Sequence, residues 1–443
     1  MDALRNLPKV DVLAASPELA AFPFQVRVLS ARQAIAETRD ALQRGSQPDD
    51  LMDRAVALAL RNAVPGLPTL INMSGVVLHT GAGRARLAPY AGSAIEAAAV
   101  SHSAVEMDLE SGARGNRQSH VKDLLCRLTG ANDALVVNNC AAAVHLVLSA
   151  LCAGRDVILS RGEMVEIGGA FRMPDIVQAT GCRLVEVGCT NKTHLSDYFN
   201  AISSETSAIL RCHRSNFKII GFTDSPSGSE LAQLSKEKSV QFIEDLGSGC
   251  LVDTSPFGLP KQRTVQDAVS DGADLVLFSG DKLLGGPQCG IIVGRDLGEI
   301  AAHPLARAFR VDKLTLAGLR ATLQLYDWGQ HDDIPTIRYL ARSLEDVRAL
   351  AEHVATGVRG ANIELGETEI GGGSAPGDTL PTWRVGFDDE RGLLAQRLRV
   401  ASPHILGRVE NGRFWLDPRT IEPTEAAVVN ERLQWMITNV SSE

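Results

Sequence analysis

Short runs of apolar residues alternate with helical patterns through the middle of this chain. The apolar runs have the length of buried strands and lie at residues 134–137, 157–159, 184–187, 208–210, 241–243 and 274–277. Between the first two, apolar residues recur at helical spacing from about residue 141 to 151, and a further helix is expected near Gly169. This alternation predicts a mostly parallel sheet with helices on both faces. Ligands of such sheets bind at the carboxyl ends of the strands.

The first 66 residues have a different pattern, which predicts a separate helical module. Val28, Ile35 and Leu42 recur every seven residues and predict one helix, which Gly45 ends. Residues 51–64 predict a second helix, and the Pro/Gly cluster at 65–68 follows it. We therefore expect a helical module over 1–66 and a large domain over 67–330.

The last hundred residues change character again. Residues 334–354 read as one long helix, with Gly357 as its stop signal. Asn411-Gly412 separates two apolar stretches, 404–409 and 413–416, and this pair is a strong signal for a two-residue hairpin. We expect a small α+β domain over residues 331–443.

Composition narrows the class of protein. Apolar residues make up 44% and charged residues 22% of the 443 positions, as in soluble globular proteins, and no apolar run has membrane-spanning length. Residues 1–6 carry no apolar signal core, so a cytoplasmic location without membrane attachment is expected. The eight cysteines form no Cys-x-x-Cys pair, which argues against a metal site and a disulfide scaffold. The net charge of -9 neither indicates nor excludes nucleic-acid binding.

Lys282 is the most informative candidate. It follows the apolar run 274–277 directly, with Ser279 and Gly280 before it and a Gly-Gly-Pro turn after it. A lysine buried at the end of a strand loses its proton readily and attacks carbonyl carbons. The carbonyl that fits is the aldehyde of pyridoxal phosphate, and Ser279 is expected beside the same cofactor. The simpler alternative is an exposed loop lysine.

Two further segments support a pyridoxal site. Asp245 ends another predicted strand, where its carboxylate could keep the ring nitrogen of the cofactor protonated. Strand alternation points Glu244 the other way, so Asp245 is preferred, although an Asp before glycine also caps turns. Asn139, Cys140 and Ala141 open the helix after the first strand, and a helix N-terminus with small side chains can hold the cofactor phosphate. An ordinary Asn N-cap is compatible with this interpretation.

Arginines form the remaining candidate set. Arg84 lies in a Gly-rich turn after the strand-like residues 76–80, and Arg307 and Arg310 would share one face if their segment is helical. Clustered arginines suit a phosphate-like anion. Each arginine alone is more often a solvated surface charge, and His213 is more often structural than catalytic.

Taken together, these segments resemble the bacterial L-seryl-tRNA(Sec) selenium transferases, also called selenocysteine synthases. Matching stretches follow in order along nearly the whole chain, at residues 4–11, 75–80, 83–85, 108–112, 114–115, 119–121, 161–169, 245–249, 278–288, 310–316, 371–374 and 412–417. The resemblance implies an enzyme of the aspartate-aminotransferase type, fold type I, with pyridoxal 5'-phosphate held by Lys282. It also implies dimers that assemble into a decamer with shared active sites.

The activity that the resemblance implies is the conversion of seryl-tRNA(Sec) to selenocysteinyl-tRNA(Sec) with selenophosphate. Lys282 would remove the Cα proton, loss of hydroxide would give a dehydroalanyl intermediate, and selenium would add at Cβ. The family's catalytic arginines, which would hold selenophosphate, fall on Arg84, Arg307 and Arg310. The N-terminal module would contact the tRNA, and the arginines that could meet its phosphates are Arg32, Arg39, Arg54 and Arg61. Solvated helix faces explain these four arginines equally well.

The sequence departs from the family pattern near the expected pocket. Residues 81–83 read Gly-Ala-Gly instead of Asn-Leu-Gly, and Arg86 stands where proline is common. Cys140 replaces a third asparagine, and Arg214 lies in a segment that usually reads His-Thr-Ser-Asn. These departures leave the cofactor assignment intact and bear on the substrate.

Two other functions remain open on sequence grounds. One is a related pyridoxal enzyme that performs β-elimination on a small amino acid or amino-sugar acid. Such a lyase has no need of a tRNA-binding module, so the N-terminal helices favour the tRNA substrate. The other is a non-catalytic tRNA-binding protein, against which Lys282 and Asp245 argue.

Overall fold

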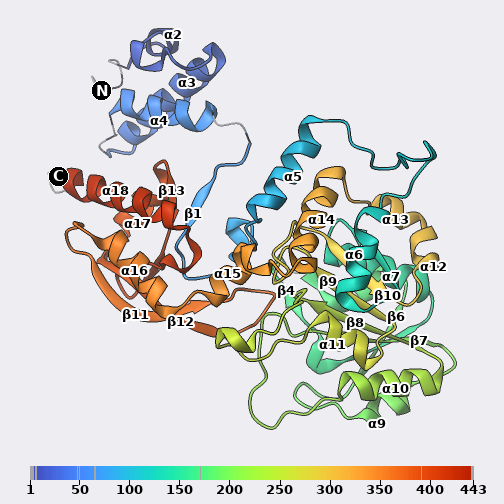
Figure 1. Cartoon of the computed structure of the whole chain (residues 1–443). Coiled ribbons are helices and arrows are strands. Elements are labelled where there is room, and N and C mark those ends of the chain that lie inside the picture. Colours follow the sequence, from blue (N-terminus) through green and yellow to red (C-terminus); the bar gives the residue numbers. More distant parts are fainter. Residues whose placement is uncertain are drawn as a thin grey trace. The chain divides into compact units, whose positions relative to one another are not determined.

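The computed structural model describes residues 4, 7–46, 48, 50–63, 66–169, 171–390 and 392–440 of the chain (Figure 1). By its internal contacts the chain separates into two units, Met1–Leu70 and Ile71–Glu443. Strand β1 (Leu70–Asn72) lies at their junction in the sequence. The division into three domains at residues 66 and 330 stays a prediction.

The first unit is helical. Its elements are α2 (Val10–Ala14), η1 (Pro17–Leu19), α3 (Phe24–Gln43) and α4 (Leu51–Ala63). Helix α3 ends two residues before Gly45, which has a φ of 76°. Val64 and Pro65, in the predicted helix end and the Pro/Gly cluster, lie outside the described residues. The interior of this unit is built mainly from small side chains and leucines: Leu13, Ala14, Leu19, Ala31, Ala34, Ile35, Ala55, Leu58 and Ala59.

The second unit contains a seven-stranded, mostly parallel sheet, as predicted. Its strands are β2 (Asp133–Val137), β3 (Asp156–Ser160), β6 (Arg183–Val187), β7 (Thr206–Cys212), β8 (Gln241–Gly247), β9 (Leu275–Ser279) and β10 (Gly290–Gly294). They are ordered β2-β10-β9-β8-β7-β3-β6, and only β10 runs antiparallel to its neighbours. Strand β10 was not predicted.

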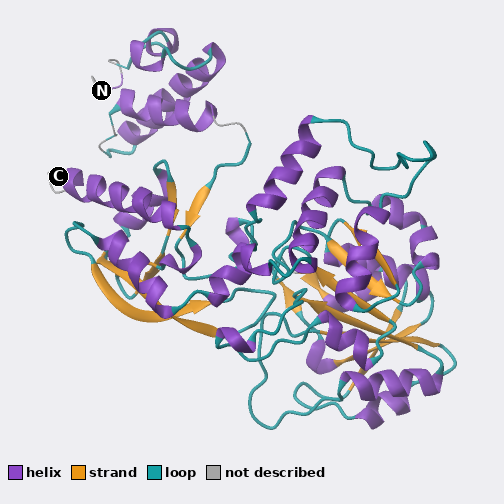
Figure 2. Cartoon of the chain, viewed as in Figure 1, coloured by secondary structure: helices purple, strands orange, loops and turns teal. Residues whose placement is uncertain are grey.

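Helices cover both faces of this sheet (Figure 2). Alternate strand residues pack on opposite sides: Val136, Phe242 and Val276 belong to one core, and Leu135, Ile243 and Leu277 to the other. The first core also contains residues of α6 (Ser119–Thr129), α10 (Gly228–Lys238), α11 (Val265–Asp271) and α14 (Lys313–Asp327). The second contains residues of α7 (Cys140–Leu151), α8 (Met173–Ala179) and α12 (Gly298–Ala302). Burial on both faces explains why these strands read as continuous apolar runs.

Several predicted elements have different bounds. Gly169 lies between two short strands, β4 (Glu166–Ile167) and β5 (Phe171–Arg172), and the helix begins only at Met173. The predicted helix over 334–354 is two helices, α15 (Pro335–Ala341) and α16 (Leu344–Ala355). Ser343 ends their continuity because its side chain accepts a hydrogen bond from the N–H of Asp346 and caps α16.

The C-terminal residues form a four-stranded antiparallel sheet with helices. Its strands are β11 (Asn362–Glu369), β12 (Thr379–Asp388), β15 (Arg413–Leu416) and β14 (Arg408–Glu410), in that order. The predicted hairpin is present, with Asn411 and Gly412 at φ values of 50° and 75° between β14 and β15. Helices α16, α17 (Leu393–Val400) and α18 (Pro423–Val440) accompany this sheet, and β13 (His404–Leu406) precedes the hairpin.

The remaining elements are α5 (Pro89–Val100), α9 (Leu195–Ala201), α13 (Pro304–Ala308) and the short turns η2 (Thr80–Ala82), η3 (Arg161–Glu163), η4 (Ser255–Phe257), η5 (His331–Asp333) and η6 (Pro418–Thr420). None of the described helices is long and apolar enough to cross a membrane.

Candidate active site

Lys282 lines a cavity of about 260 Å³ at the carboxyl ends of the parallel strands. The lysine is 7% exposed and follows β9 by three residues. Its Nζ has no hydrogen-bond or ion-pair partner among the described residues. Gly373, at a φ of 88°, lies so close that a Cβ there would be 2.7 Å from Nζ. The glycine-rich loop before β12 therefore closes over the amine only because it lacks side chains.

Asp245 and Glu244 occupy neighbouring positions on β8 and line different cavities. Asp245 shares the cavity of Lys282, and its Oδ1 accepts hydrogen bonds from the N–H of Gly247 at 3.0 Å and from Cys140 Sγ at 3.5 Å. Burial raises the pKa of Asp245, and the nearby Lys282 opposes this rise. The buried carboxylate and the amine thus lie in one pocket, at the ends of the two neighbouring strands β8 and β9.

The first turn of α7 also opens into this cavity, through Asn139, Cys140 and Ala141. Asn139 is the N-cap, and its Oδ1 accepts from the N–H of Ala142 at 2.8 Å. Gly290 of β10 passes so close that a Cβ there would lie 2.1 Å from the Asn139 carbonyl oxygen. The helix start is therefore held against the sheet edge, with its first-turn N–H groups available to an anion.

Cys140 retains a hydrogen-bond donor at the position where it replaces an asparagine. Burial, with the charge of Asp245 next in importance, raises the pKa of its thiol well above the ordinary value. The thiol therefore stays protonated and donates to Asp245. Ser279, the last residue of β9, is 5% exposed and lines the same cavity.

Arg84 also lines this cavity, although its local structure differs from the prediction. Of residues 76–80, only Val76 forms a single bridge, to Glu369, and Thr80 begins the turn η2. Arg84 adopts the left-handed region at a φ of 63°, and its Nη1 lies 2.6 Å from Asp281 Oδ2.

Arg307 and Arg310 are not among the residues that line the cavity. Arg307 is exposed on α13, which ends at Ala308, so the two arginines do not share a helical face as predicted. Arg310 follows the helix and makes an antiparallel bridge with Val137, while its Nη1 lies 3.3 Å from Glu106 Oε1. Of the three predicted arginines, only Arg84 lines the same cavity as Lys282 within one chain.

The residues present fit pyridoxal phosphate. An amine without a partner, a buried carboxylate and a helix N-terminus match the aldehyde, ring nitrogen and phosphate of that cofactor. Two further polar atoms in the cavity, His213 Nδ1 and Ser215 Oγ, are buried and have no hydrogen-bond partner among the residues that the structure describes. Burial lowers the pKa of His213 to about 4, so its imidazole is neutral. Buried polar groups left without partners are typical of a site that a ligand completes.

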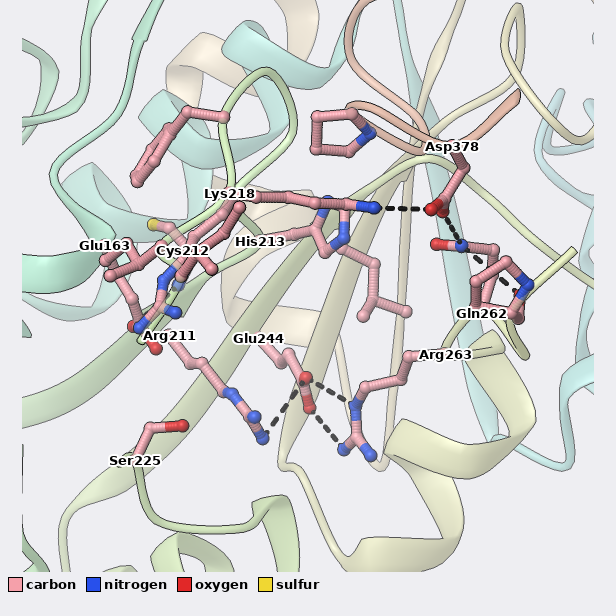
Figure 3. A pocket seen from close by; sticks show the side chains of 17 residues that line it. Glu163, Arg211, Cys212, His213, Lys218, Ser225, Glu244, Gln262, Arg263 and Asp378 are labelled. Atoms are coloured by element: carbon pink, nitrogen blue, oxygen red, sulfur yellow. Dashed lines mark hydrogen bonds and ion pairs between the residues drawn. The ribbon is translucent and has the colours of Figure 1, made fainter. Parts of the chain in front are cut away.

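A second cavity of about 440 Å³ lies beside the first, and His213 lines both (Figure 3). Its other polar side chains were not predicted as site residues, and they are Glu163, Arg211, Arg214, Lys218, Ser225, Glu244, Gln262, Arg263 and Asp378. Glu163 follows the end of β3, as Asp245 lies near the end of β8. This position after an apolar run could have identified Glu163 from the sequence as a residue at the carboxyl edge of the sheet. It is 6% exposed, and its Oε2 accepts from the N–H of Cys212 at 3.2 Å.

Glu163 should make the protein less stable as the pH rises toward neutrality. Burial raises its pKa from 4.5 to about 7, so between these pH values the folded state binds more protons than the unfolded state. The free energy of unfolding therefore falls over this range, by up to about 3 kcal/mol for a shift of this size. In Glu163→Gln this titration is absent, so its urea midpoint should exceed that of the wild type more at pH 8 than at pH 5.

The control for this measurement is Glu345→Gln, because Glu345 is exposed on α16. Its midpoint should follow that of the wild type at every pH. A Glu163→Gln advantage of equal size at pH 5 and pH 8 would contradict the assignment.

Comparison with known proteins agrees with this architecture. A solved structure titled "Structure of D-Glucosaminate-6-phosphate Ammonia-lyase" superposes with a TM-score of 0.59 at 21% identity, covering 85% of this chain and 97% of that one. This likeness shows a shared fold, the fold type I of pyridoxal-phosphate enzymes.

Two curated bacterial relatives match almost end to end. The L-seryl-tRNA(Sec) selenium transferase of Hyphomonas neptunium is 44% identical, over 94% of this chain and 95% of its own length. That of Geobacter sulfurreducens is 43% identical, over 98% and 99%. A family model described as L-seryl-tRNA selenium transferase matches residues 70–422, and the chain belongs to that family.

Proposed function

We propose that this protein converts L-seryl-tRNA(Sec) to L-selenocysteinyl-tRNA(Sec), with selenophosphate as the selenium donor and pyridoxal phosphate as the cofactor. Family membership supports the reaction, because the curated relatives carry that name. The observation that carries the chemistry is the partnerless amine of Lys282 beside the buried carboxylate of Asp245 in one cavity.

In this proposal the residues of the chain act as follows. Lys282 would hold the cofactor by its aldehyde group, and its Nζ would take the Cα proton of the seryl group. The same Nζ then delivers a proton to the departing hydroxyl group. Asp245 keeps the ring nitrogen protonated, with Cys140 Sγ and the Gly247 N–H orienting its carboxylate. When bound, the cofactor supplies an electron sink for the charge that develops at Cα.

The phosphate group of the cofactor is assigned to the start of α7, where Asn139, Cys140 and Ala141 line the cavity. Ser279 closes the same side of the cavity from the end of β9. Arg84 is proposed to hold the selenophosphate anion, with its guanidinium oriented by the 2.6 Å ion pair to Asp281. Arg32, Arg39 and Arg61, which are exposed in the helical unit, and Arg54 are proposed to meet tRNA phosphates.

One experiment tests the substrate. The purified protein, loaded with cofactor and given selenophosphate, is incubated separately with seryl-tRNA(Sec), free serine and an amino-sugar acid, and the products are identified by mass spectrometry. Selenocysteine attached to the tRNA is expected, with neither small molecule consumed. Conversion of free serine or of the amino-sugar acid, with the tRNA ester unchanged, would establish the small-molecule lyase instead.

The separation of Arg307 and Arg310 from the cavity supports a further part of the proposal. We infer that a second copy of the chain supplies these arginines, in a homodimer that assembles further into a decamer. Lys282→Ala and Arg310→Gln chains should each be inactive alone. Coexpressed, they should regain part of the wild-type turnover, because one site of each mixed dimer keeps both residues. Coexpressed chains that form mixed dimers, shown by two affinity tags, yet stay inactive would place both residues in one chain's site.

A further inference from the structure

The second cavity contains cations whose hydrogen-bonding capacity the protein itself does not use. Some of its charges are paired: Arg263 donates to both oxygens of Glu244, at 2.7 and 2.8 Å, and its Nη2 also lies 2.8 Å from Asp271. Lys218 Nζ pairs with Asp378, which also accepts from Gln262 (Figure 3). The charges of Arg263 and Lys218 are therefore balanced by carboxylates of the protein itself.

Arg211 and Arg214 are paired less completely. Arg211 Nη1 is buried without a hydrogen bond and lies 3.7 Å from Glu244 Oε1, an oxygen that already accepts from Arg263. Arg214 donates from Nε to the Gly162 carbonyl oxygen at 2.9 Å and has no ion pair with a carboxylate among the described residues. Both side chains are partly exposed, but a buried donor such as Arg211 Nη1 is costly unless a ligand accepts from it.

Glu163 adds a complementary group. It is buried, it lines the same cavity, and within the described part of the chain its one hydrogen bond is to the N–H of Cys212. Neither Arg211 nor Arg214 lies within ion-pair distance of its carboxylate. The cavity thus presents two sets of unused N–H donors and one carboxylate that can accept from an O–H group.

We propose that the second cavity binds a free phosphate-class oxyanion. Oxygens of such an anion accept from Arg211 and Arg214, and guanidinium groups match this geometry well. At pH 8, above the pKa of about 7 that burial gives Glu163, this side chain is ionised and accepts from the O–H group that phosphate keeps. Sulfate carries no proton at this pH, so it would leave Glu163 facing an anion without a hydrogen bond. The site is therefore expected to prefer phosphate to sulfate.

Local structure explains why the site forms here. Gly162 in η3 has no Cβ, and one at that position would lie 2.6 Å from the Thr190 carbonyl oxygen and 3.2 Å from Arg214 Nη2. The glycine therefore allows Arg214 to approach η3 beside Glu163.

Calorimetric titration of the cofactor-loaded protein tests the proposal, because the bound cofactor occupies its own phosphate site. Inorganic phosphate and sulfate are titrated separately at pH 8, where Glu163 is ionised, in a buffer that contains neither. Up to two phosphates per chain are expected, one at the proposed selenophosphate position of Arg84 and one in the second cavity, and the latter should be bound more tightly than sulfate. Arg214→Gln should weaken phosphate binding at least about tenfold, since it removes a charge-assisted contact. Glu163→Gln should reduce the preference for phosphate over sulfate.

Arg348→Gln is the matched control, because Arg348 is exposed on α16 and pairs only with Glu352 and the Trp383 ring among the described residues. Its phosphate affinity should equal that of the wild type. Absence of phosphate binding by the wild type would overturn the proposal, as would equal affinities in the wild type and Arg214→Gln. These measurements do not involve turnover, so their outcome is independent of the proposed selenium transfer.

Discussion

Replacing Lys282 with alanine should abolish turnover and the visible absorbance of lysine-bound pyridoxal phosphate together. The side chain is 7% exposed in the first cavity, and its Nζ has no partner within the described chain that could take over its role. Loss of a general base alone lowers rates by about 10²–10⁴-fold, and loss of the covalent link to the cofactor adds to this. An absorbance scan of the purified variant, followed by the selenocysteine assay, measures both effects.

Lys261→Ala serves as the control, because Lys261 is more than half exposed and its Nζ lies 3.4 Å from Asp267 Oδ1. That variant should keep the absorbance and the turnover of the wild type. Wild-type absorbance and turnover in Lys282→Ala would refute the assignment of the lysine. Circular dichroism of the variant separates a chemical loss from a failure to fold.

Replacing Asp245 with asparagine should leave the cofactor attached to Lys282 and lower turnover by about 10²–10³-fold, the usual effect of removing one preorganised electrostatic contact. An amide of the same shape keeps the contacts of the side chain but cannot hold the ring nitrogen protonated. Because Asp245 is buried with hydrogen bonds from Cys140 and Gly247, no solvent ion replaces its charge. The visible absorbance of the bound cofactor should shift, since the protonation of the ring changes.

Asp388→Asn is the matched control, because its side chain is 89% exposed. It should alter neither the absorbance nor the rate. An Asp245→Asn protein with wild-type turnover and an unshifted spectrum would require another residue as the partner of the ring nitrogen.

The arrangement of Lys282, Asp245 and Asn139 could be predicted because parallel strands end at a common edge. Each residue directly follows or ends an apolar run, so their proximity follows from the class of sheet alone. The alternation of side chains along a strand likewise predicted that Asp245 and Glu244 point in opposite directions, and the two residues line different cavities.

Features that depend on packing between distant segments could not be predicted. The apolar residues recur at helical spacing across the break between α15 and α16. The helix is nevertheless interrupted there, because Ser343 caps the start of α16. The position of Arg310 depends on its bridge with Val137, a contact across more than 170 positions of sequence. The second cavity combines β7, β8 and the loop that contains Asp378, and no local pattern indicates that these residues meet.

The adjacent placement of Glu244 and Asp245 constrains how this protein can evolve. Successive side chains of β8 line different cavities. Inserting or deleting one residue within the strand would therefore turn the partner of Arg263 toward the first cavity and the proposed cofactor partner toward the second. Length variation among descendants of this chain should therefore be absent from residues 241–247.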